Sequence, residues 1–475
     1  MAQTSHRNRP PPAGRPSHET GNAVFVTGPF FQRTDWLSFG LTAVVALAVY
    51  LHTLAPEVTL EYSGILSTSA KYAGVAHPPG YPVWTLYSWL FVTLLPFSNI
   101  AWRVAVGSAV AAALACGLVA LMVSRAGTML LETTPAFTSR KLAEQKLLRV
   151  VCGYVAGMAL GLSRTVWRVA VVAETWALSV LLFAIMLCLL MRWTGRPERR
   201  RFLYGAFFVF GLLLTSNQEL LVMTPALLLL VIFRDQALGR DLSLVISLLA
   251  VTNWAVSVLG LSYWLGSDML GNVGLLVASL LLGVAAVVGI VRTRRFASEW
   301  TSASVCGVLF LLGLGWYFYL PFTSMTNPPV NWGYPRTAEG FFHLITRGQY
   351  ERYHPTDELG RFIGQLWILA KETGKRFGWP YLVVAVLPFG LLRRARGCGP
   401  IWLLGLATAF VCVGPLMVAL LNPSEDQVIE QPIIGPYFAA IYFILALLTG
   451  LGLMVFGCMV AKPQMEPRPD PMPHS

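Results

Sequence analysis

Long apolar runs separated by short polar stretches dominate the chain. Most of the runs are close to twenty residues long, which is the length of helix that crosses the hydrocarbon core of a bilayer. We therefore predict an all-α polytopic membrane protein with about twelve spans. The runs are 36–55, 101–124, 147–163, 170–191, 202–216, 219–233, 242–265, 270–291, 302–321, 378–392, 400–421 and 436–460.

Clusters of basic residues predict the orientation of these spans. Loops that stay in the cytosol carry an excess of lysine and arginine. With the N-terminus inside, alternate loops and the two tails hold 24 of the 35 lysines and arginines. A shift by one span would place the cluster Arg196–Arg201 outside. Both termini are therefore predicted to be cytosolic.

One apolar run, residues 83–95, is not counted as a span. Its thirteen residues would form a helix of about 20 Å, against a hydrocarbon core of about 30 Å. The run is rich in aromatic residues, which favour the membrane interface. We predict a helix lying along the outer surface, within a first outer loop at about 56–100. Two further outer loops are expected at 322–378, with a short helix over residues 337–349, and at 422–435.

Composition limits the class of protein. The chain is 55% hydrophobic and 12% charged, whereas a soluble domain carries about 25% charged residues. The net charge of +12 lies in short loops, so we predict no nucleic-acid partner. The seven cysteines show no metal or disulfide spacing. The polar, proline-containing ends predict disordered cytosolic tails at 1–35 and 461–475, on either side of a transmembrane domain at 36–460.

Polar residues interrupt the spans near their outer ends. The runs 202–216 and 219–233 are short, about 22 Å each as helices, so their junction 215–219 should lie below the outer rim. Glu174 is expected at a similar depth. Polar side chains there are costly unless they meet a partner or a wet cavity. Interhelical hydrogen bonds are one explanation. A shared polar groove is the other, and several polar features at one depth favour it.

An outer groove with carboxylates and arginines suits the transfer of a sugar from a lipid phosphate. The phosphate leaves without needing a proton, but its developing charge needs cationic or hydrogen-bonding stabilisation. The acceptor hydroxyl needs a general base within hydrogen-bond reach. One carboxylate and one arginine would suffice for an inverting reaction.

Several stretches together resemble a known family. The chain reads LAPEVTLEYSG, GVAHPPGYP, LLLTSNQELLVMTPAL and TNPPVNWGYPRTAEGFFHLITRGQYE. It resembles, from about 35 to 460, a bacterial membrane family long labelled a domain of unknown function. That family is placed among the GT-C glycosyltransferases and is related to a eukaryotic protein O-mannosyltransferase. The resemblance implies a GT-C-like bundle, a polyprenyl- or dolichyl-phosphate sugar donor, and a catalytic first outer loop.

The chain departs from the family at its acidic positions. The family reads Thr-x-x-Asp-Ser-Gly-Glu where this chain has Tyr62 in place of the aspartate and Ile65 in place of the glutamate. Three interpretations remain open. Glu61 could be re-aimed into the groove as the base, or Glu57 or Glu174 could take that role. Alternatively, the protein could have lost transfer chemistry while keeping lipid or sugar binding.

The candidate site residues follow from these arguments, and most have a plain structural alternative. His77 could cap the Pro-Pro turn and Arg103 could reach the interface, while the other arginines could be solvated surface charges. Trp332 could stack on a sugar or anchor its loop, and Asn331 could shape a turn. The catalytic candidates are Glu61, Tyr62 and Glu174. The substrate-binding candidates are His77, Arg103, Asn217, Gln218, Asn331, Trp332, Arg336, Arg347 and Gln349.

The expected function is transfer of a sugar, with mannose implied by the resemblance, from a polyprenyl-phosphate donor to a protein or glycan acceptor at the outer face. The alternatives are a catalytically silent homologue that binds lipid-linked sugar and a transporter of a lipid-linked substrate. Membrane lipids are expected partners. No cofactor is assigned, and a divalent metal ion stays possible although no ligand set is seen. The expected location is a bacterial inner membrane, with the site facing the periplasm.

Overall fold

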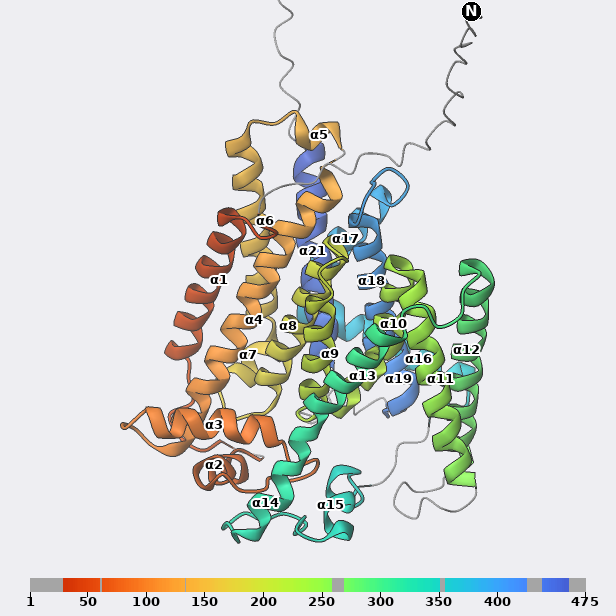
Figure 1. The fold of residues 1–475 in the computed structure, drawn as a ribbon. Coiled ribbons are helices and arrows are strands. Elements are labelled where there is room, and N and C mark those ends of the chain that lie inside the picture. The colour runs from red at the N-terminus through yellow and green to blue at the C-terminus, as the bar shows by residue number, and fades with distance from the viewer. Residues whose placement is uncertain are drawn as a thin grey trace, which may run out of the picture.

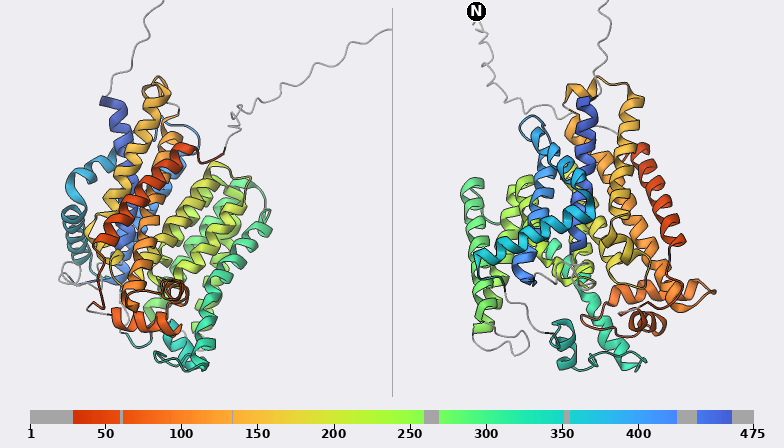
Figure 2. Two further views of the ribbon diagram at one scale, coloured as in Figure 1. Left: turned by 90° about the vertical axis from the view of Figure 1, so that its left-hand side faces the viewer. Right: turned by 180° about the vertical axis from the view of Figure 1, so that it is seen from behind.

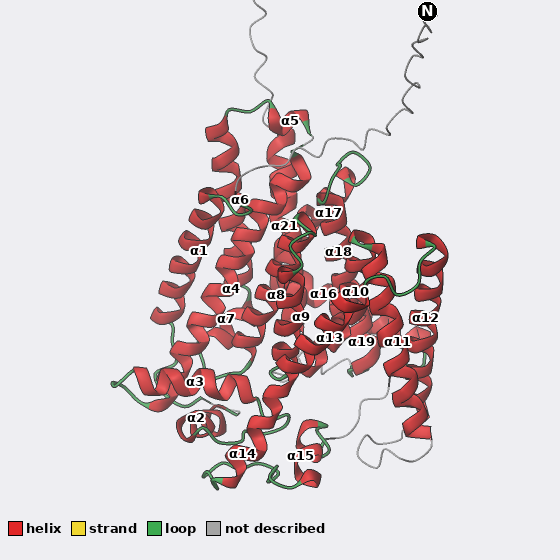
Figure 3. Ribbon diagram, in the orientation of Figure 1, coloured by secondary structure: helices red, strands yellow, loops and turns green. Residues whose placement is uncertain are grey.

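The computed structural model describes residues 29–59, 62–132, 134–258, 269–350, 355–424 and 438–460. Within these ranges the chain is helical, with no named strand and one isolated bridge between Val75 and Asn331. Helices make up nearly all of the ribbon (Figure 3). The prediction of an all-α membrane protein is confirmed. Residues 1–28 and 461–475 of the predicted tails, the loop around 259–268 and most of the loop 422–435 lie outside the described residues. The end of the predicted N-terminal tail needs a correction, because residues 33–35 belong to the first helix and Asp35 is buried.

The first half of the chain forms ten α-helices and one short 3-10 helix. They are α1 (Arg33–His52), α2 (Ser63–Tyr72), α3 (Pro82–Leu94), α4 (Ile100–Leu131), α5 (Pro135–Thr138), α6 (Leu142–Gly161), α7 (Arg164–Ala170), α8 (Trp176–Gly195), α9 (Arg201–Leu214), η1 (Gln218–Met223) and α10 (Thr224–Arg234).

The second half is equally helical in its described part. Its elements are α11 (Gln236–Val258), α12 (Met269–Thr293), α13 (Trp300–Leu314), η2 (Gly315–Phe318), α14 (Tyr319–Met325), α15 (Ala338–Ile345), α16 (Leu359–Thr373), η3 (Gly374–Gly378), α17 (Trp379–Val386), η4 (Leu387–Leu391), α18 (Gly399–Val411), η5 (Cys412–Leu416), α19 (Met417–Leu421) and α21 (Ala439–Val460).

The long helices stand side by side in one bundle, with α4, α8 and α21 in its interior (Figures 1 and 2). At one end of the bundle lie α2, α3, α14 and α15, and we call this the loop end. At the other end lie α5, the start of α1 and the end of α21 (Figure 1). We call it the basic end, because the arginine-rich loop 393–396 is also there (Figure 2).

Close packing of α6 against α4 depends on three glycines spaced four residues apart. A Cβ atom at Gly153 would lie 2.7 Å from the carbonyl oxygen of Ala120, and one at Gly157 would lie 2.6 Å from that of Cys116. Gly161 continues the same face of α6. Small residues at this spacing let membrane helices approach until their backbones touch. Larger side chains here would push α6 off the centre of the bundle.

A buried ion pair fixes the start of α1 at the basic end. Arg149 on α6 donates to the carboxylate of Asp35 at 2.6 Å, and Ser124 on α4 donates to the same oxygen at 2.5 Å. Asp35 is fully buried. A carboxylate at such a site is stabilised only when its partners stay in place. This polar contact therefore ties three helices together.

Six helical segments in the described part of the chain are long and apolar enough to cross a membrane, and α6 with α7 would make a seventh, bent by 71°. The protein is a multi-pass membrane protein; the count of twelve stays a prediction. The expected span at 170–191 needs a correction. Residues 164–170 form the separate helix α7, and α8 begins only at Trp176.

The predicted surface elements are found at the loop end. Residues 82–94 form α3, which lies across the ends of the bundle helices (Figure 1). Pro82 starts it, after Tyr81 in a left-handed conformation. The short helix expected over 337–349 is α15, and Thr337 caps its first turn by accepting from Gly340 N–H at 3.0 Å. The sequence did not predict α16, which occupies part of the same expected loop.

Candidate functional site at the loop end

The two segments with the most distinctive motifs are paired directly with each other. Val75 lies just before the His-Pro-Pro-Gly-Tyr-Pro turn, and its N–H donates to the carbonyl of Val330 at 2.9 Å. Trp332 N–H returns a bond to the carbonyl of Val75 at 3.2 Å. Asn331, between them, donates its side-chain amide to Ser324 O at 3.2 Å. Both segments lie at the same end of the molecule, as the sequence predicted.

The His-Pro-Pro-Gly-Tyr-Pro turn is buried, although it lies in a loop. Gly80 N–H closes it by donating to His77 O at 2.9 Å. Gly80 has φ +94°, and a Cβ there would lie 2.9 Å from the methyl groups of Leu320. Glycine is therefore required both by the backbone conformation and by the space. The turn packs against Leu320 of α14 and Leu344 of α15.

Tyr62 stacks on His77. Their ring centres are 4.4 Å apart and the rings are within 19° of parallel. Trp332 approaches His77 edge-on at 6.5 Å, and its indole N–H donates to Gln349 Oε1 at 2.7 Å. Aromatic rings in these arrangements stabilise each other beyond simple burial. Tyr62, which stands where the family has an aspartate, is thus held by an aromatic contact.

The junction between α9 and α10 reaches the same place from inside the bundle. Gln218 donates its amide to Ile345 O at 2.8 Å and to the hydroxyl of Tyr317 at 2.9 Å. Glu219 forms an ion pair with Arg347, which follows α15. We call the connected group the loop-end cluster; its members are Tyr62, His77, Gln218, Glu219, Trp332, Arg347 and Gln349.

Strained backbone conformations concentrate around this cluster. Nine residues other than glycine have positive φ in the described part of the chain, and five of them lie in the two paired segments. Such conformations cost about 1 kcal/mol or more each, and they gather at sites where geometry matters for function. The five are Ala73, Tyr81, Asn327, Tyr334 and Arg347.

Burial controls the charge state of His77. The side chain is 7% exposed, and its Nδ1 has no hydrogen-bond partner among the described residues. Burial, and to a smaller extent the positive charge of Arg347, lowers the pKa of His77 to about 4. His77 is therefore neutral at physiological pH. A neutral imidazole can accept a proton or a hydrogen bond.

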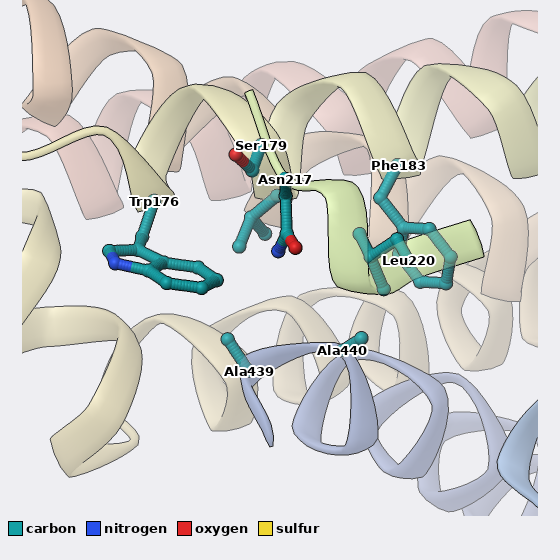
Figure 4. Close-up of a pocket in the computed structure, with 8 residues that line it drawn as sticks. Trp176, Ser179, Phe183, Asn217, Leu220, Ala439 and Ala440 are labelled. Atoms are coloured by element: carbon teal, nitrogen blue, oxygen red, sulfur yellow. The ribbon is translucent and has the colours of Figure 1, made fainter. Parts of the chain in front are cut away.

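A small pocket lies beside the cluster, under Asn217. Trp176 and Ser179 on α8, Leu220 on η1 and Ala439 on α21 line it (Figure 4). The Asn217 side chain points into it, is 5% exposed, and its Oδ1 has no hydrogen-bond partner among the described residues. The predicted polar groove is therefore a mainly apolar hollow with one buried amide at its wall.

Glu174 is placed near this pocket but does not line it. Its Oε1 accepts from the N–H of Thr175 at 2.8 Å, while its carbonyl accepts from Trp84 Nε1 at 3.0 Å. The carbonyl contact ties the crosswise helix α3 to the segment before α8. The carboxylate is half-buried. Its catalytic role stays a prediction.

Arg103 holds the end of α3. Its guanidinium donates to three carbonyl oxygens, those of Phe97 at 2.9 Å, Ser98 at 2.9 Å and Val92 at 3.2 Å. These acceptors are the free carbonyls that follow a helix end. These hydrogen bonds give Arg103 a structural role. Arg103 is not part of the loop-end cluster, and its predicted contact with a phosphate stays a prediction.

The candidate Arg336 is not part of the cluster. Arg336 donates to Asn327 Oδ1 at 2.9 Å on the exposed side of the loop. Glu61 lies outside the described residues. No three of the His, Cys, Asp and Glu side chains described could together hold a metal ion.

Sequence analysis did not identify two residues that contribute to this site, Glu219 in the cluster and Tyr317 beside it. Glu219 was not a candidate acid, because the resemblance pointed to the acidic positions of the first outer loop. Tyr317 was counted within an apolar run, yet its hydroxyl donates to Leu214 O at 3.1 Å and accepts from Gln218. A glutamate in the polar junction 215–219, between two apolar runs, was the available signal for Glu219.

Comparisons with known proteins find similarity over part of the chain. Residues 63–239 match the family model described as Protein O-mannosyl-transferase TMEM260 N-terminal domain. The mouse protein named Protein O-mannosyl-transferase TMEM260 is 29% identical over 222 residues, which cover 45% of this chain and 28% of the mouse protein. The chain thus matches less than a third of that relative's length. No solved structure matches.

The matched residues contain the His77 turn, Glu174 and the 217–219 junction, whereas Trp332, Arg347 and Gln349 lie beyond the matched family domain. The family expected from the sequence motifs and the family found by comparison are the same kind, a membrane glycosyltransferase-like one. Residues 63–239 of this chain are therefore similar to the N-terminal domain of that protein O-mannosyl-transferase family.

Proposed function

We propose that this protein transfers a sugar from a polyprenyl-phosphate donor to a protein or glycan acceptor on the extracytoplasmic side of the membrane. Mannose is the first sugar to test, because the mouse relative is named an O-mannosyl-transferase. The loop end would face the acceptor, and the donor's tail would stay in the bilayer.

One observation carries the proposal: the loop-end cluster brings together a cation, a carboxylate and an aromatic ring. Arg347 offers a cation for a phosphate, Glu219 offers a carboxylate, and Trp332 offers an aromatic face. Two chain segments far apart in sequence supply them, the junction 215–219 and the outer segment that holds Trp332 and Arg347. A lipid-phosphate sugar needs such a combination, because its leaving group is anionic and its acceptor must lose a proton.

A catalytically silent homologue is the second candidate, and Tyr62 favours it. The stack of Tyr62 on His77 occupies the place of the family's aspartate with an aromatic ring that has no basic group at neutral pH. Such a protein would keep the binding of lipid-linked sugar without transfer.

A transfer assay separates the two candidates. Purified protein in lipid nanodiscs would be given radiolabelled polyprenyl-phosphate mannose and a mixture of acceptor peptides. Transfer by the wild type supports the enzyme. Transfer only after Tyr62→Asp with Ile65→Glu supports the silent homologue. If neither protein binds or transfers the donor, both candidates fail.

A further inference from the structure

The ion pair between Glu219 and Arg347 bridges two parts of the molecule. Glu219 is the second residue of η1 inside the bundle, while Arg347 lies in the outer segment after α15. Their side chains are 12% and 25% exposed, respectively. This partial exposure is important, because a deeply buried pair could not change partners without a large desolvation cost. Both side chains thus keep part of their surface accessible to a ligand.

The neighbours keep the pair in register. Gln218, next to Glu219, donates to the carbonyl of Ile345 at 2.8 Å, only two residues before Arg347. The ring of Tyr350 lies 5.4 Å from the Arg347 guanidinium carbon. These contacts hold the backbone beside Glu219 and the backbone beside Arg347 in place. The ion pair between the two side chains can then break without moving either segment.

Arg347 has φ +58°, in the left-handed region that L-amino acids rarely adopt. The position directly follows the last turn of α15, where glycine or asparagine would be the unstrained choice. An arginine there costs backbone energy that its side chain must offset. This observation indicates that the guanidinium has a task at this point.

We propose, on the basis of the proposed function, that Arg347 and Glu219 form an exchangeable pair. The phosphate of the lipid donor displaces the Glu219 carboxylate from Arg347. Glu219, freed from its cation, then becomes the base for the acceptor hydroxyl. The donor therefore binds first, and its binding makes the Glu219 carboxylate available as a base.

The transfer step balances with these two residues. The acceptor oxygen attacks the anomeric carbon of the sugar, and its proton passes to the Glu219 carboxylate. The bond between the anomeric carbon and the phosphate oxygen breaks. The lipid phosphate takes the electron pair and leaves as a dianion beside Arg347. Charge-assisted bonds from arginine to phosphate are suited to this growing charge.

Lipid binding tests the exchange without needing turnover. The probes are a polyprenyl monophosphate, the matching polyprenol without phosphate, a phosphatidic acid and inorganic phosphate, each titrated into protein in neutral nanodiscs. The variants are Glu219→Gln, Arg347→Gln and Arg347→Lys. The matched controls, Glu339→Gln and Arg361→Gln, change exposed residues of the same outer segments.

We expect Glu219→Gln to bind the polyprenyl phosphate roughly three- to tenfold more tightly, because the competing carboxylate no longer masks the arginine. Arg347→Gln should weaken binding roughly tenfold or more, and Arg347→Lys should weaken it less. The controls should stay within about twofold. Glu219→Gln should also lose transfer despite its tighter binding.

A change in affinity of the opposite sign for Glu219→Gln would overturn the proposed exchange. If Glu219→Gln binds the phosphate equally or more weakly while the wild type binds it, Glu219 only orients Arg347 and the inference fails, but the proposed function survives. Equal binding of phosphatidic acid would make the site a general lipid-phosphate site and would overturn the donor assignment. If neither the wild type nor Glu219→Gln binds any probe, both proposals fail.

Discussion

At the scale of single residues, His77 lies where the paired outer segments and the Glu219–Arg347 pair meet. Tyr62 covers one face of its ring, and Arg347 lies close enough to repel a proton from it. The sequence presented His77 either as a ligand or as a turn residue. The structure gives it a turn hydrogen bond through its carbonyl and a buried, neutral ring.

The pKa of His77 provides the residue-scale prediction. In the wild type it should be about 4, and Arg347→Gln should raise it while burial keeps it below about 6.5. NMR titration of histidine-labelled protein in detergent measures this, and the signal missing from His77→Asn identifies the residue among the seven histidines. A wild-type pKa near 6.5, or a lower one in Arg347→Gln, would contradict the burial and the proximity of Arg347.

The sign of the effect on stability follows from the direction of the shift. A histidine whose pKa is lowered by folding stabilises the native state fully above its unfolded pKa of about 6.5. This contribution is lost as the pH falls through the folded value of about 4. Acid between these values should therefore loosen the contact between the two outer segments.

At the scale of elements, the pairing of the His77 segment with the Trp332 segment positions the site. Helix α3 lies crosswise because its first residue follows this buried turn, and because Trp84 and Arg103 fix its two ends. Helix α15 is held over the same turn by Leu344, which is fully buried. The site thus depends on how elements are placed as much as on its own side chains.

Gly74 tests that pairing. A Cβ atom there would lie 2.5 Å from the carbonyl oxygen of Val330, which is backbone and cannot move aside cheaply. Gly74→Ala should destabilise the loop end by ~2 kcal/mol, as overpacking does elsewhere. Faster proteolysis within 322–350 and a lower melting temperature in detergent would show it.

Gly64→Ala is the matched control, since its Cβ would meet only Val58 Cγ1 at an ordinary 3.7 Å. In helix α2 this change should be neutral or slightly stabilising, because alanine favours the helix. Equal proteolysis of both variants would argue against the close approach at Gly74.

At the scale of the whole molecule, sidedness is the property on which the proposed function depends. The basic loops and the described ends of the chain lie at one end of the bundle, while the paired outer segments lie at the other (Figure 1). This arrangement agrees with the alternation of basic loops read from the sequence.

Cysteine labelling tests the sidedness. Six of the seven native cysteines are buried and Cys398 is half-buried, so a Cys398→Ser background should label weakly. Single cysteines at the exposed positions Glu57 and Thr326 should react with a membrane-impermeant maleimide from outside intact cells. One at Arg394 should react only after the cells are opened. Reaction of Glu57→Cys and Thr326→Cys from different sides would overturn the map.

Much of the architecture could be predicted because bilayer thickness and backbone hydrogen bonding leave few choices. The helix at 82–94 and the one at 338–345 were expected from length and spacing. The separate helix α7 was not, because residues 164–169 were read as a connection between two apolar runs; Gly161 and Ser163 at the bend were the available signal. Helix α16 was missed because the 322–378 segment was read as a loop with one helix.

The sequence by itself determined the membrane class, the polarity of its loops and the residue types available for chemistry, because these follow from apolar runs, charge clusters and composition. Only the tertiary structure decided which of those residues meet. It set Tyr62 on His77, gave Arg103 to the carbonyls at the end of α3, and paired Glu219 with Arg347. The pairing of Glu219 with Arg347 joins positions more than a hundred residues apart, and it depends on how whole helices pack rather than on any local pattern.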